Sequence, residues 1–245
     1  MRYSRQLLLE EFPEQAQEKL ANSRVLIIGL GGLGSPAALY LAGAGIGTLV
    51  IADDDKVHIS NLQRQILFTQ RDIGEVKSTA ASRHLAALNP ECRIIPLAER
   101  LHGKALSNAV NEASLVLDCS DNMATRQEIN AACVRHQTPL ITASATGMAG
   151  QFMVLTPPWA NGCYRCLWPE MTEPTNNCRT AGVLGPVVGM MGTMQALAAI
   201  KLLAGIETES GTLTLFDARQ QRWRLIHLTR APGCPVCGDH HASVA

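Results

Sequence analysis

The 245-residue sequence is poor in aromatic residues and carries no net charge. Only 4% of the residues are Phe, Trp or Tyr, so a folded core must depend on aliphatic side chains and methionine. Lysine plus arginine and aspartate plus glutamate number 21 each. This balance excludes the strong field of one sign that is typical of proteins binding nucleic acid or anionic membranes. We therefore expect neither kind of partner.

The N-terminus, MRYSRQLLLEEF, lacks the long apolar run of a secretory signal peptide. Without such a leader the eight cysteines do not indicate a disulfide framework, and we expect a cytoplasmic protein. Residues 180–200 carry no charge, over about the length of a transmembrane helix. The glycines in this run favour instead a helix that closely approaches another backbone in the core or at an interface.

The first 145 residues alternate between strand and helix patterns. This alternation predicts an α/β fold, with a Rossmann-like, mostly parallel sheet and helices on both faces. Strands are expected near 24–29, 48–53, 92–97, 114–118 and 139–143, and helices near 33–44, 75–88, 103–111 and 123–136.

The remaining residues predict a different arrangement. A further strand at 151–158 precedes a long loop at 159–182, a helix near 187–204, and an antiparallel pair of strands at 212–218 and 222–229. A loop of that length is uncommon unless it is functional. We expect a single domain, 1–245, with a nucleotide-binding half of about 1–145 and a smaller half of about 146–245.

The stretch VLIIGLGGLGSPAALYL, residues 25–41, contains the glycine fingerprint of a nucleotide-binding turn. A strand leads into Gly29, Gly31 and Gly34, and a small-residue helix follows, so that a helix N-terminus would face phosphate. Asp53 ends the next strand, where an acidic side chain meets a ribose hydroxyl. The pattern does not distinguish NAD from ATP, and a tight turn without a ligand is the alternative.

The segment SNLQRQILF, residues 60–68, favours ATP over NAD. Asn61, Gln63 and Arg64 cluster beyond the second strand, where NAD needs no guanidinium and a triphosphate does. Arg64 can hold phosphate oxygens in a bidentate fork, and Lys77 adds a second positive charge. Solvated surface charges are the alternative for either side chain alone.

VLDCSDN, residues 116–122, ends the fourth strand. Because ligands bind at the carboxyl ends of parallel strands, Asp121 is a candidate ligand for Mg²⁺ on the phosphates. The alternative is that Asp121 caps the next helix, although Asn122 or Asp118 could be the cap instead.

Two C-x-x-C pairs give the strongest spacing signal. Each pair presents two thiolates, and two pairs favour one structural, tetrahedral zinc site over redox chemistry. The four predicted ligands are Cys163, Cys166, Cys234 and Cys237.

The other four cysteines divide into two kinds. Cys92, Cys119 and Cys133 lie in strand or helix patterns and are predicted to be small core residues. Cys178 lies in a polar loop beside Arg179, which would lower the pKa of its thiol. An inert loop cysteine is the alternative.

These motifs, together with RYSRQ near the N-terminus, occur in the order found in the family of ThiF, MoeB and the ubiquitin-activating enzymes. The sequence resembles this family over essentially its whole length. The stretches DNMATRQEINAAC, PLITASA, VLTPPW and CYRCLWP are more similar to the branch of thiamine thiazole biosynthesis than to the molybdopterin branch, which remains the alternative.

The resemblance implies a nucleotidyltransferase that uses ATP and Mg²⁺ to adenylylate the C-terminal glycine carboxylate of a ubiquitin-like sulfur carrier ending in Gly-Gly. It further implies a homodimer and a sulfur donor protein, either a cysteine desulfurase or a rhodanese-type protein. Arg5 would reach the ATP site of the other subunit, and Cys178 would link covalently to the carrier. Nucleotide contacts are implied for Gly31, Gly32, Asp53, Ser60, Asn61, Leu62, Gln63, Arg64, Lys77, Asp121 and Asn122.

Two other classes of function are weaker candidates. An NAD-dependent oxidoreductase is favoured only by the glycine turn and Asp53. A zinc-ribbon binding module without catalysis would not require Arg64 for its function. Exchange of pyrophosphate into ATP would exclude the first class, and a loss of function on removing Arg64 would exclude the second.

Overall fold

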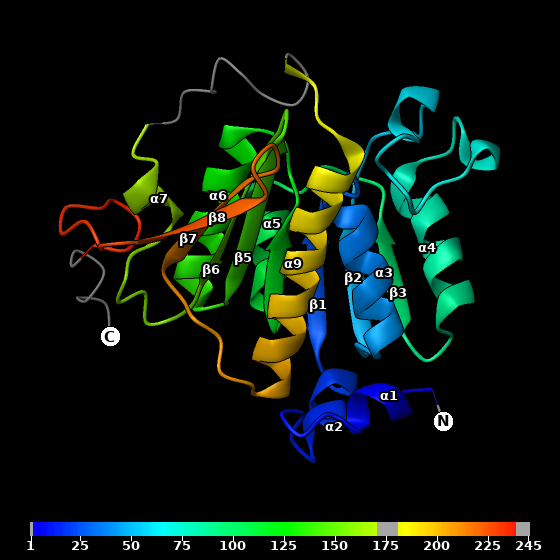
Figure 1. Cartoon of the computed structure of the whole chain (residues 1–245), viewed down its shortest axis with the longest axis horizontal. Helices are drawn as coiled ribbons and strands as arrows, with labels where there is room; N and C mark the ends of the chain where they lie inside the picture. Colours follow the sequence, from blue (N-terminus) through cyan, green and yellow to red (C-terminus); the bar gives the residue numbers. More distant parts are fainter. Residues whose placement is uncertain (1, 171–180, 239–245) are drawn as a thin grey trace.

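The structure, a computed structural model, describes residues 2–170 and 181–238. Within this part of the chain, eight strands form one sheet in the order β3-β2-β1-β4-β5-β6-β7-β8 (Figure 1). Strands β1 to β5 are parallel, and β5 to β8 are antiparallel, as the sequence predicts. The strands are β1 (Arg24–Ile28), β2 (Thr48–Ala52), β3 (Arg93–Leu97), β4 (Leu115–Asp118), β5 (Leu140–Thr146), β6 (Ala149–Leu155), β7 (Thr212–Asp217) and β8 (Arg222–His227).

Helices cover both faces of the sheet. One face carries α3, α4 and α9, which lie side by side in Figure 1, and the other carries α5 and α6. The short helices α1 and α2 lie near the amino ends of the parallel strands, and α7 lies in the connection after β6. The helices are α1 (Ser4–Leu7), α2 (Ala16–Ala21), α3 (Gly34–Ala44), α4 (Lys77–Leu88), α5 (Gly103–Asn111), α6 (Met123–His136), α7 (Tyr164–Leu167) and α9 (Gly185–Ala204), with single 3-10 turns η1 (Ile59–Asn61) and η2 (Gln70–Asp72).

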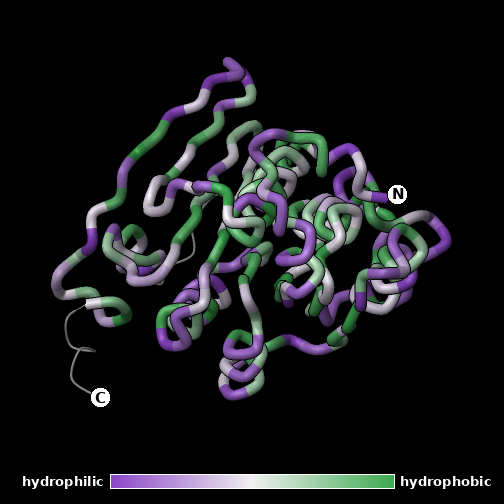
Figure 2. Tube along the Cα trace, turned by 90° about the horizontal axis from the view of Figure 1, so that it is seen from below, coloured by the Kyte–Doolittle hydropathy of each residue, from purple (hydrophilic) through white to green (hydrophobic). Residues whose placement is uncertain are grey.

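The central strands divide the core into two layers. In β1, Val25 and Ile27 face the cluster under α3, α4 and α9, whereas Leu26 and Ile28 face the cluster under α5 and α6. A strand buried on both faces needs a continuous apolar run, which is why VLII lacks the polar alternation of a half-exposed strand. Figure 2 shows apolar segments concentrated on the central strands and helices, and hydrophilic segments on the connections at the rim.

Helix α9 contains most of the uncharged run. By length and composition alone it could cross a membrane, but half of its apolar window is buried inside the molecule, where it packs on α3, β5 and β6. A Cβ on Gly192 would lie 2.2 Å from the carbonyl oxygen of Leu33, so a side chain there is excluded. The close approach predicted from the glycines is confirmed, and the run is a core helix.

The largest differences from the predicted boundaries lie at β5 and β6. Strand β5 continues to Thr146, and β6 begins at Ala149, so the two strands form a tight hairpin around Gly147, whose φ is +60°. Strand β6 ends at Leu155 because the prolines that follow shortly after it, Pro157 and Pro158, have no N–H to donate to a ladder. The predicted long loop also contains one short helix, α7.

Candidate nucleotide site

A cavity of about 650 Å³ lies at the carboxyl ends of β1, β2 and β4. The strand order reverses between β1 and β4, and such a switch point leaves a crevice above an open α/β sheet. Most of the residues predicted to contact the nucleotide line this cavity: Gly31, Gly32, Asp53, Asn61, Arg64, Lys77, Asp121 and Asn122.

The other three predicted contacts lie outside the lining. Ser60 accepts a hydrogen bond from Arg64 Nη1 through its carbonyl oxygen, at 3.0 Å. Leu62 packs against the core under α3 and α9. Gln63 is exposed, and its carbonyl oxygen would lie 2.6 Å from a Cβ on Gly185, at the start of α9. In this structure the three residues hold the segment that carries Arg64.

The glycine turn between β1 and α3 is closed by contacts that exclude side chains. Gly29 has a φ of +93°, and a Cβ on Gly34 would lie 2.0 Å from the carbonyl oxygen of Gly29. Gly32 also faces the cavity, and a Cβ there would lie 2.8 Å from Val188 of α9. The backbone at the N-terminus of α3 is therefore open to an anion.

Asp53 connects the glycine turn to the end of β2. Its Oδ2 accepts the Leu30 N–H at 2.7 Å, and its Oδ1 accepts the Asp55 N–H at 2.9 Å. Burial raises the pKa of Asp53 above its usual range, against the opposing effect of Lys77 and of the two N–H groups. Each carboxylate oxygen keeps a lone pair, so Asp53 can still accept ribose hydroxyls.

Lys77 is buried at the start of α4, and its ammonium forms an ion pair with a carboxylate at the cavity. The Nζ atom lies 2.6 Å from Asp55 Oδ2, and only 6% of the Lys77 side chain is exposed. Burial opposes ionisation of Asp55, but Lys77 outweighs it and lowers the pKa of that carboxyl. No local sequence pattern identifies Asp55 as the partner of Lys77, because the two residues lie 22 positions apart on different elements.

The connection after β4 places a carboxylate on the opposite wall. Asn122 caps α6, since its Oδ1 accepts the Thr125 N–H at 2.9 Å. Asp121 is exposed and lines the cavity, and it is not used as the cap. Of the alternatives weighed from the sequence, the cap is Asn122, which leaves Asp121 available for a metal ion.

A buried polar network fixes the connection between β4 and α6. Arg126 Nη1 lies 3.2 Å from Asp118 Oδ2 and also donates to Thr142 Oγ1 and to the carbonyl oxygen of Ala143. Its Nη2 donates to the carbonyl oxygen of Ser120, next to Asp121. From α9, Gln195 donates to the carbonyl oxygen of Asp118 at 2.9 Å. Sequence reasoning missed this network; a lone Gln in the apolar run of α9 was the available signal.

The four paired cysteines form a second cluster, at the other edge of the sheet. Their sulfur atoms lie within 4.8 Å of one another, and the Cys163–Cys234 and Cys166–Cys237 separations are 3.8 and 3.4 Å. A tetrahedral zinc ion with Zn–S bonds of about 2.3 Å places its sulfurs about 3.8 Å apart. The cluster therefore fits the predicted structural zinc site.

Residues of α6 fix the orientation of this cluster. The buried Asn130 donates to Cys163 Sγ at 3.4 Å and accepts the Tyr164 N–H at 2.9 Å. Gln127 donates to the carbonyl oxygen of Trp168 at 2.7 Å. The helix that begins at the nucleotide site thus also holds the cysteine cluster.

The remaining cysteines in the described residues are core side chains. Cys92, Cys119 and Cys133 are buried free thiols, as predicted, and burial raises the pKa of each thiol. Cys178 lies outside the described residues.

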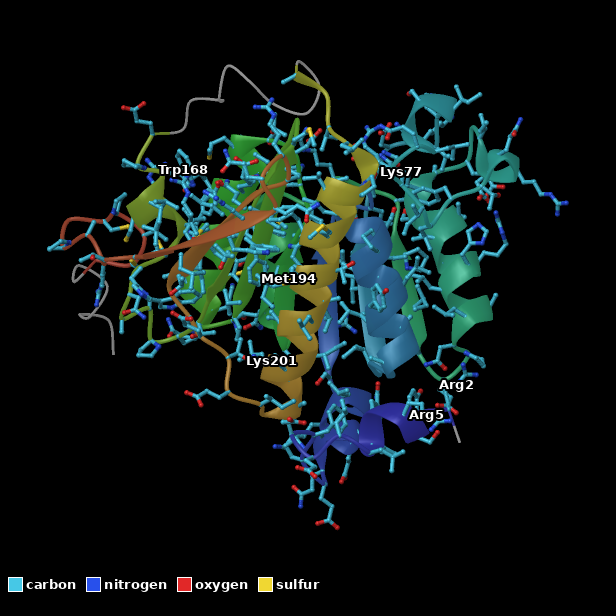
Figure 3. All side chains as sticks on the ribbon, viewed as in Figure 1. Arg2, Arg5, Lys77, Trp168, Met194 and Lys201 are labelled. Carbon is cyan, nitrogen blue, oxygen red and sulfur yellow. The ribbon has the colours of Figure 1, made fainter. Side chains whose placement is uncertain are left out.

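Arg5 lies in α1, at the opposite end of the molecule from Lys77 (Figure 3). Its segment is anchored by neighbours: the Tyr3 hydroxyl donates to Glu91 at 2.7 Å, and Gln6 donates to the carbonyl oxygen of Ala44 at 2.9 Å. Arg5 itself is exposed and does not line the cavity of its own chain.

Comparisons with known proteins agree with this geometry. The chain is 66% identical over 242 residues to the sulfur carrier protein ThiS adenylyltransferase of Escherichia coli K12, covering 99% of this chain and 96% of that protein. It is 44% identical over 240 residues to the molybdopterin-synthase adenylyltransferase of Salmonella typhimurium, covering 98% and 96%. The crystal structure of E. coli MccB with ATP superposes with a TM-score of 0.83 at 25% identity, covering 97% of this chain and 74% of that one.

The sequence profile of the ThiF family matches residues 3–236, which include the glycine turn, Arg64, Lys77, Asp121 and three of the four clustered cysteines. The chain belongs to the ThiF family.

Proposed function

We propose that the protein adenylylates the C-terminal glycine carboxylate of a ThiS-type sulfur carrier in thiamine thiazole biosynthesis, in the cytoplasm. The observation that carries the proposal is the cavity itself, where a glycine turn, two cations and an exposed carboxylate meet. The identity of 66% with a ThiS adenylyltransferase supports this choice of carrier over a molybdopterin carrier.

We place the nucleotide in the cavity with its ribose at the end of β2 and its phosphates at the N-terminus of α3. Asp53 accepts the ribose hydroxyls, and the N-terminus of α3 receives the phosphates beside Gly31 and Gly32. Arg64 and Lys77 neutralise the phosphate charge, and Asp121 holds Mg²⁺ through oxygen, the ligand atom that Mg²⁺ prefers. Bound Mg²⁺ supplies further positive charge at the phosphates.

The reaction joins a carboxylate to phosphorus. A carboxylate oxygen of the carrier attacks the α-phosphorus, the bond from that phosphorus to the bridging oxygen breaks, and pyrophosphate leaves with the electron pair. No base is needed because the carboxylate is already ionised. The chain's cations oppose the repulsion between two anions, which is the main barrier to attack.

We assign Arg5 to the site of a second subunit in a homodimer, because within one chain it lies far from Lys77. Chains carrying Arg5→Ala or Arg64→Ala, each inactive alone, should regain activity when mixed, since a mixed dimer contains one site with both arginines. No recovery, with subunit exchange demonstrated by native mass spectrometry, would contradict this assignment.

Sulfur enters after adenylation. A persulfide sulfur of a donor protein, a cysteine desulfurase or a rhodanese-type protein, attacks the acyl carbon of the adenylate and displaces AMP, which gives an acyl disulfide between carrier and donor. The Cys178 thiolate exchanges into this disulfide and releases the donor thiol, so that the carrier is linked to Cys178. A further thiol reduces the link and frees the thiocarboxylate. Cys178→Ala should keep pyrophosphate exchange and lose the adduct in intact mass spectra under non-reducing conditions. An adduct of unchanged yield would move the covalent role to another cysteine.

Exchange of labelled pyrophosphate into ATP tests the function, with ThiS-type and MoaD-type carriers supplied side by side. Exchange should require Mg²⁺ and be faster with the ThiS-type carrier. A carrier lacking its last glycine is the matched control, because its carboxylate cannot reach the α-phosphorus. Faster exchange with the MoaD-type carrier would favour the molybdopterin reaction instead, and no exchange with either would reject the proposal.

A further inference from the structure

The segment that carries Arg5 is fixed to the molecule without a hydrophobic anchor. Helix α1 contains no buried residue, and its first turn closes on the Tyr3 carbonyl oxygen, which accepts the N–H groups of Gln6 and Leu7 at 3.1 Å. Burial of an apolar face, which usually stabilises a helix in a protein, therefore does not hold α1 in place. The contacts that do so are made by polar side chains on either side of Arg5.

Tyr3 contacts three residues that follow α3 and α4. Its hydroxyl donates to Glu91 Oε2 at 2.7 Å and accepts from Asn89 Nδ2 at 2.9 Å. Asn89 is fully buried and also donates to the carbonyl oxygen of Ala42 at 2.7 Å. The tyrosine ring lies against Gly45, where a Cβ would stand 2.7 Å from it. One side chain thus connects α1 to the C-terminal ends of two helices of the core.

Two further side chains of the RYSRQ motif hold the same segment. Arg2 Nη1 donates to the carbonyl oxygen of Leu88 at 3.0 Å, and Gln6 Nε2 donates to that of Ala44 at 2.9 Å. Arg5 is exposed, and its guanidinium has no hydrogen-bond or ion-pair partner within residues 2–170 and 181–238. The motif therefore fixes the backbone around Arg5 and leaves the charge of Arg5 available to a group outside its own chain.

We propose that Tyr3 is a positioning residue, which holds Arg5 in the orientation that reaches the nucleotide of the other subunit. The inference rests on the proposed homodimer, in which Arg5 serves the second site. A guanidinium on a fixed helix loses less conformational entropy when it binds phosphate than one on a loose terminus. Helix α3 then serves both sites, because its N-terminus faces the phosphates of its own chain and its other end seats the segment that carries Arg5.

Tyr3→Phe is the first test, because phenylalanine keeps the ring on Gly45 and removes both hydroxyl bonds. Pyrophosphate exchange, and ATP affinity measured by calorimetry, should each fall by up to about tenfold, the effect of one hydrogen bond to a charged group. The affinity should not fall further when Tyr3→Phe is added to Arg5→Ala, because Tyr3 acts through Arg5. Glu112→Ala is the matched control: it removes an exposed bond from Arg24 at the same end of the sheet and should change neither quantity.

Two mixed dimers, isolated by different affinity tags on the two chains, separate positioning from a general effect on the fold. Both contain one Tyr3→Phe and one Arg64→Ala substitution. With the substitutions on different chains, the site that keeps Arg64 receives Arg5 from a chain with an intact Tyr3, and it should exchange at the rate of one wild-type site. With both substitutions on one chain, the site that keeps Arg64 receives Arg5 from the Tyr3→Phe chain. Its exchange should be slower by the factor that Tyr3→Phe causes alone.

Three results would overturn the inference. Equal exchange rates in the two mixed dimers would show that Tyr3 only stabilises the fold. A loss confined to the dimer with the substitutions on different chains would show that Tyr3 acts on the site of its own chain. Additive losses of ATP affinity in the double variant would show that Tyr3 does not act through Arg5. Failure of the wild-type protein to exchange pyrophosphate with any carrier would instead reject the proposed function, while the ATP affinities would still decide the role of Tyr3.

Discussion

Strands β1 and β8 belong to one sheet but lie in different surroundings. Four of the five β1 residues are buried, between helices on both faces, whereas all six β8 residues are exposed. One ring contact, Phe216 against Trp223 at 4.4 Å between centroids, packs β8 on β7. Hydrophobic burial therefore accounts for the stability of β1 and leaves little for β8.

The segment after β8 is held in place by the cysteine cluster. Leu228 donates its N–H to Gly211, and the Ala231 N–H points at Cys166 Sγ, at 3.4 Å. Cys234 and Cys237 then join the cluster begun by α7. The comparison indicates that the nucleotide half folds around apolar side chains, and it predicts that the opposite edge depends on a metal ion held by the four cysteines.

Removing one cluster cysteine should give the largest effect. Cys234→Ser should release the zinc ion and lower the free energy of unfolding by about 5 kcal/mol or more, because a structural zinc site contributes about 10–16 kcal/mol in small peptides. Hydrogen exchange should accelerate most in β7 and β8 and least in β1. Metal analysis and exchange mass spectrometry measure both.

Cys133→Ser is the control for zinc content, since this buried cysteine of α6 lies outside the cluster. It should keep one zinc ion per chain. Two results would contradict the inferred difference between the two halves. One is intact protein without zinc. The other is hydrogen exchange in Cys234→Ser that accelerates equally in β1 and β8.

Removing a charge from the nucleotide cavity should have the opposite effect: activity should fall and stability should stay nearly unchanged. Arg64→Ala and Asp121→Ala should each lower pyrophosphate exchange about a thousandfold, as the loss of a charged transition-state contact does. The free energy of unfolding without nucleotide should change by less than about 1 kcal/mol, because both side chains make few contacts. Exchange at the normal rate in either variant would show that its assigned role is wrong.

The predictable part of the site follows from local patterns. The glycine turn, the acidic ends of β2 and β4 and the two C-x-x-C pairs each lie within a few residues, and the rule that ligands sit at the carboxyl ends of strands brings them together. The core cysteines were also predictable, because their neighbours have strand or helix patterns. These features were predicted without any knowledge of side-chain packing.

The missed part depends on contacts between distant elements. Asp118 and Arg126 meet because α6 folds back along β4, and Gln195 joins them from α9. The pair Asp55–Lys77 spans the connection from β2 to α4. Partners of buried polar groups are set by three-dimensional packing, and no spacing rule in one sequence identifies them.

Substitution of Asp72 tests how the connection between β2 and α4, which carries Arg64, is stabilised. Burial alone would raise the pKa of this carboxyl, but hydrogen bonds from Thr69 and His84 outweigh it and lower the pKa to about 2. Arg83 Nη2 also lies 2.5 Å away. Asp72→Asn should cost about 1–3 kcal/mol of unfolding free energy at pH 7, the usual penalty for leaving buried groups unpaired.

The pH dependence of this cost has a definite sign. A carboxyl whose pKa is lowered by folding stabilises the protein fully above its unfolded value, about 3.9, and progressively less as the pH falls toward 2. The difference between wild type and Asp72→Asn in urea unfolding should therefore be constant from pH 7 to 5 and smaller at pH 3. Glu75→Gln removes the other carboxylate partner of Arg83 and should cost less than Asp72→Asn, because this ion pair lies at the surface, where solvent screens it. A difference that grows on acidification would contradict the assignment.

The smallest effect is expected from removing the charge of Asp55, which pairs with Lys77 in this structure. Asp55 is 58% exposed and pairs with Lys77 Nζ at 2.6 Å, so a triphosphate must compete with it for the same ammonium. Asp55→Asn should tighten ATP binding about fivefold, equivalent to about 1 kcal/mol between partly solvated charges. It should also lower the melting temperature without ATP, because a buried ammonium loses its partner.

Asp54→Asn is the matched control for this last change, because it removes the same charge from the same cavity without touching the ion pair. If the tighter binding came only from a lower negative potential, both variants would tighten it equally. A larger effect of Asp55→Asn would show that Lys77 exchanges a carboxylate for a phosphate. Weaker ATP binding in Asp55→Asn would mean that Asp55 itself holds the nucleotide or its metal ion. The nucleotide cavity would then contain a second carboxylate ligand beside Asp121.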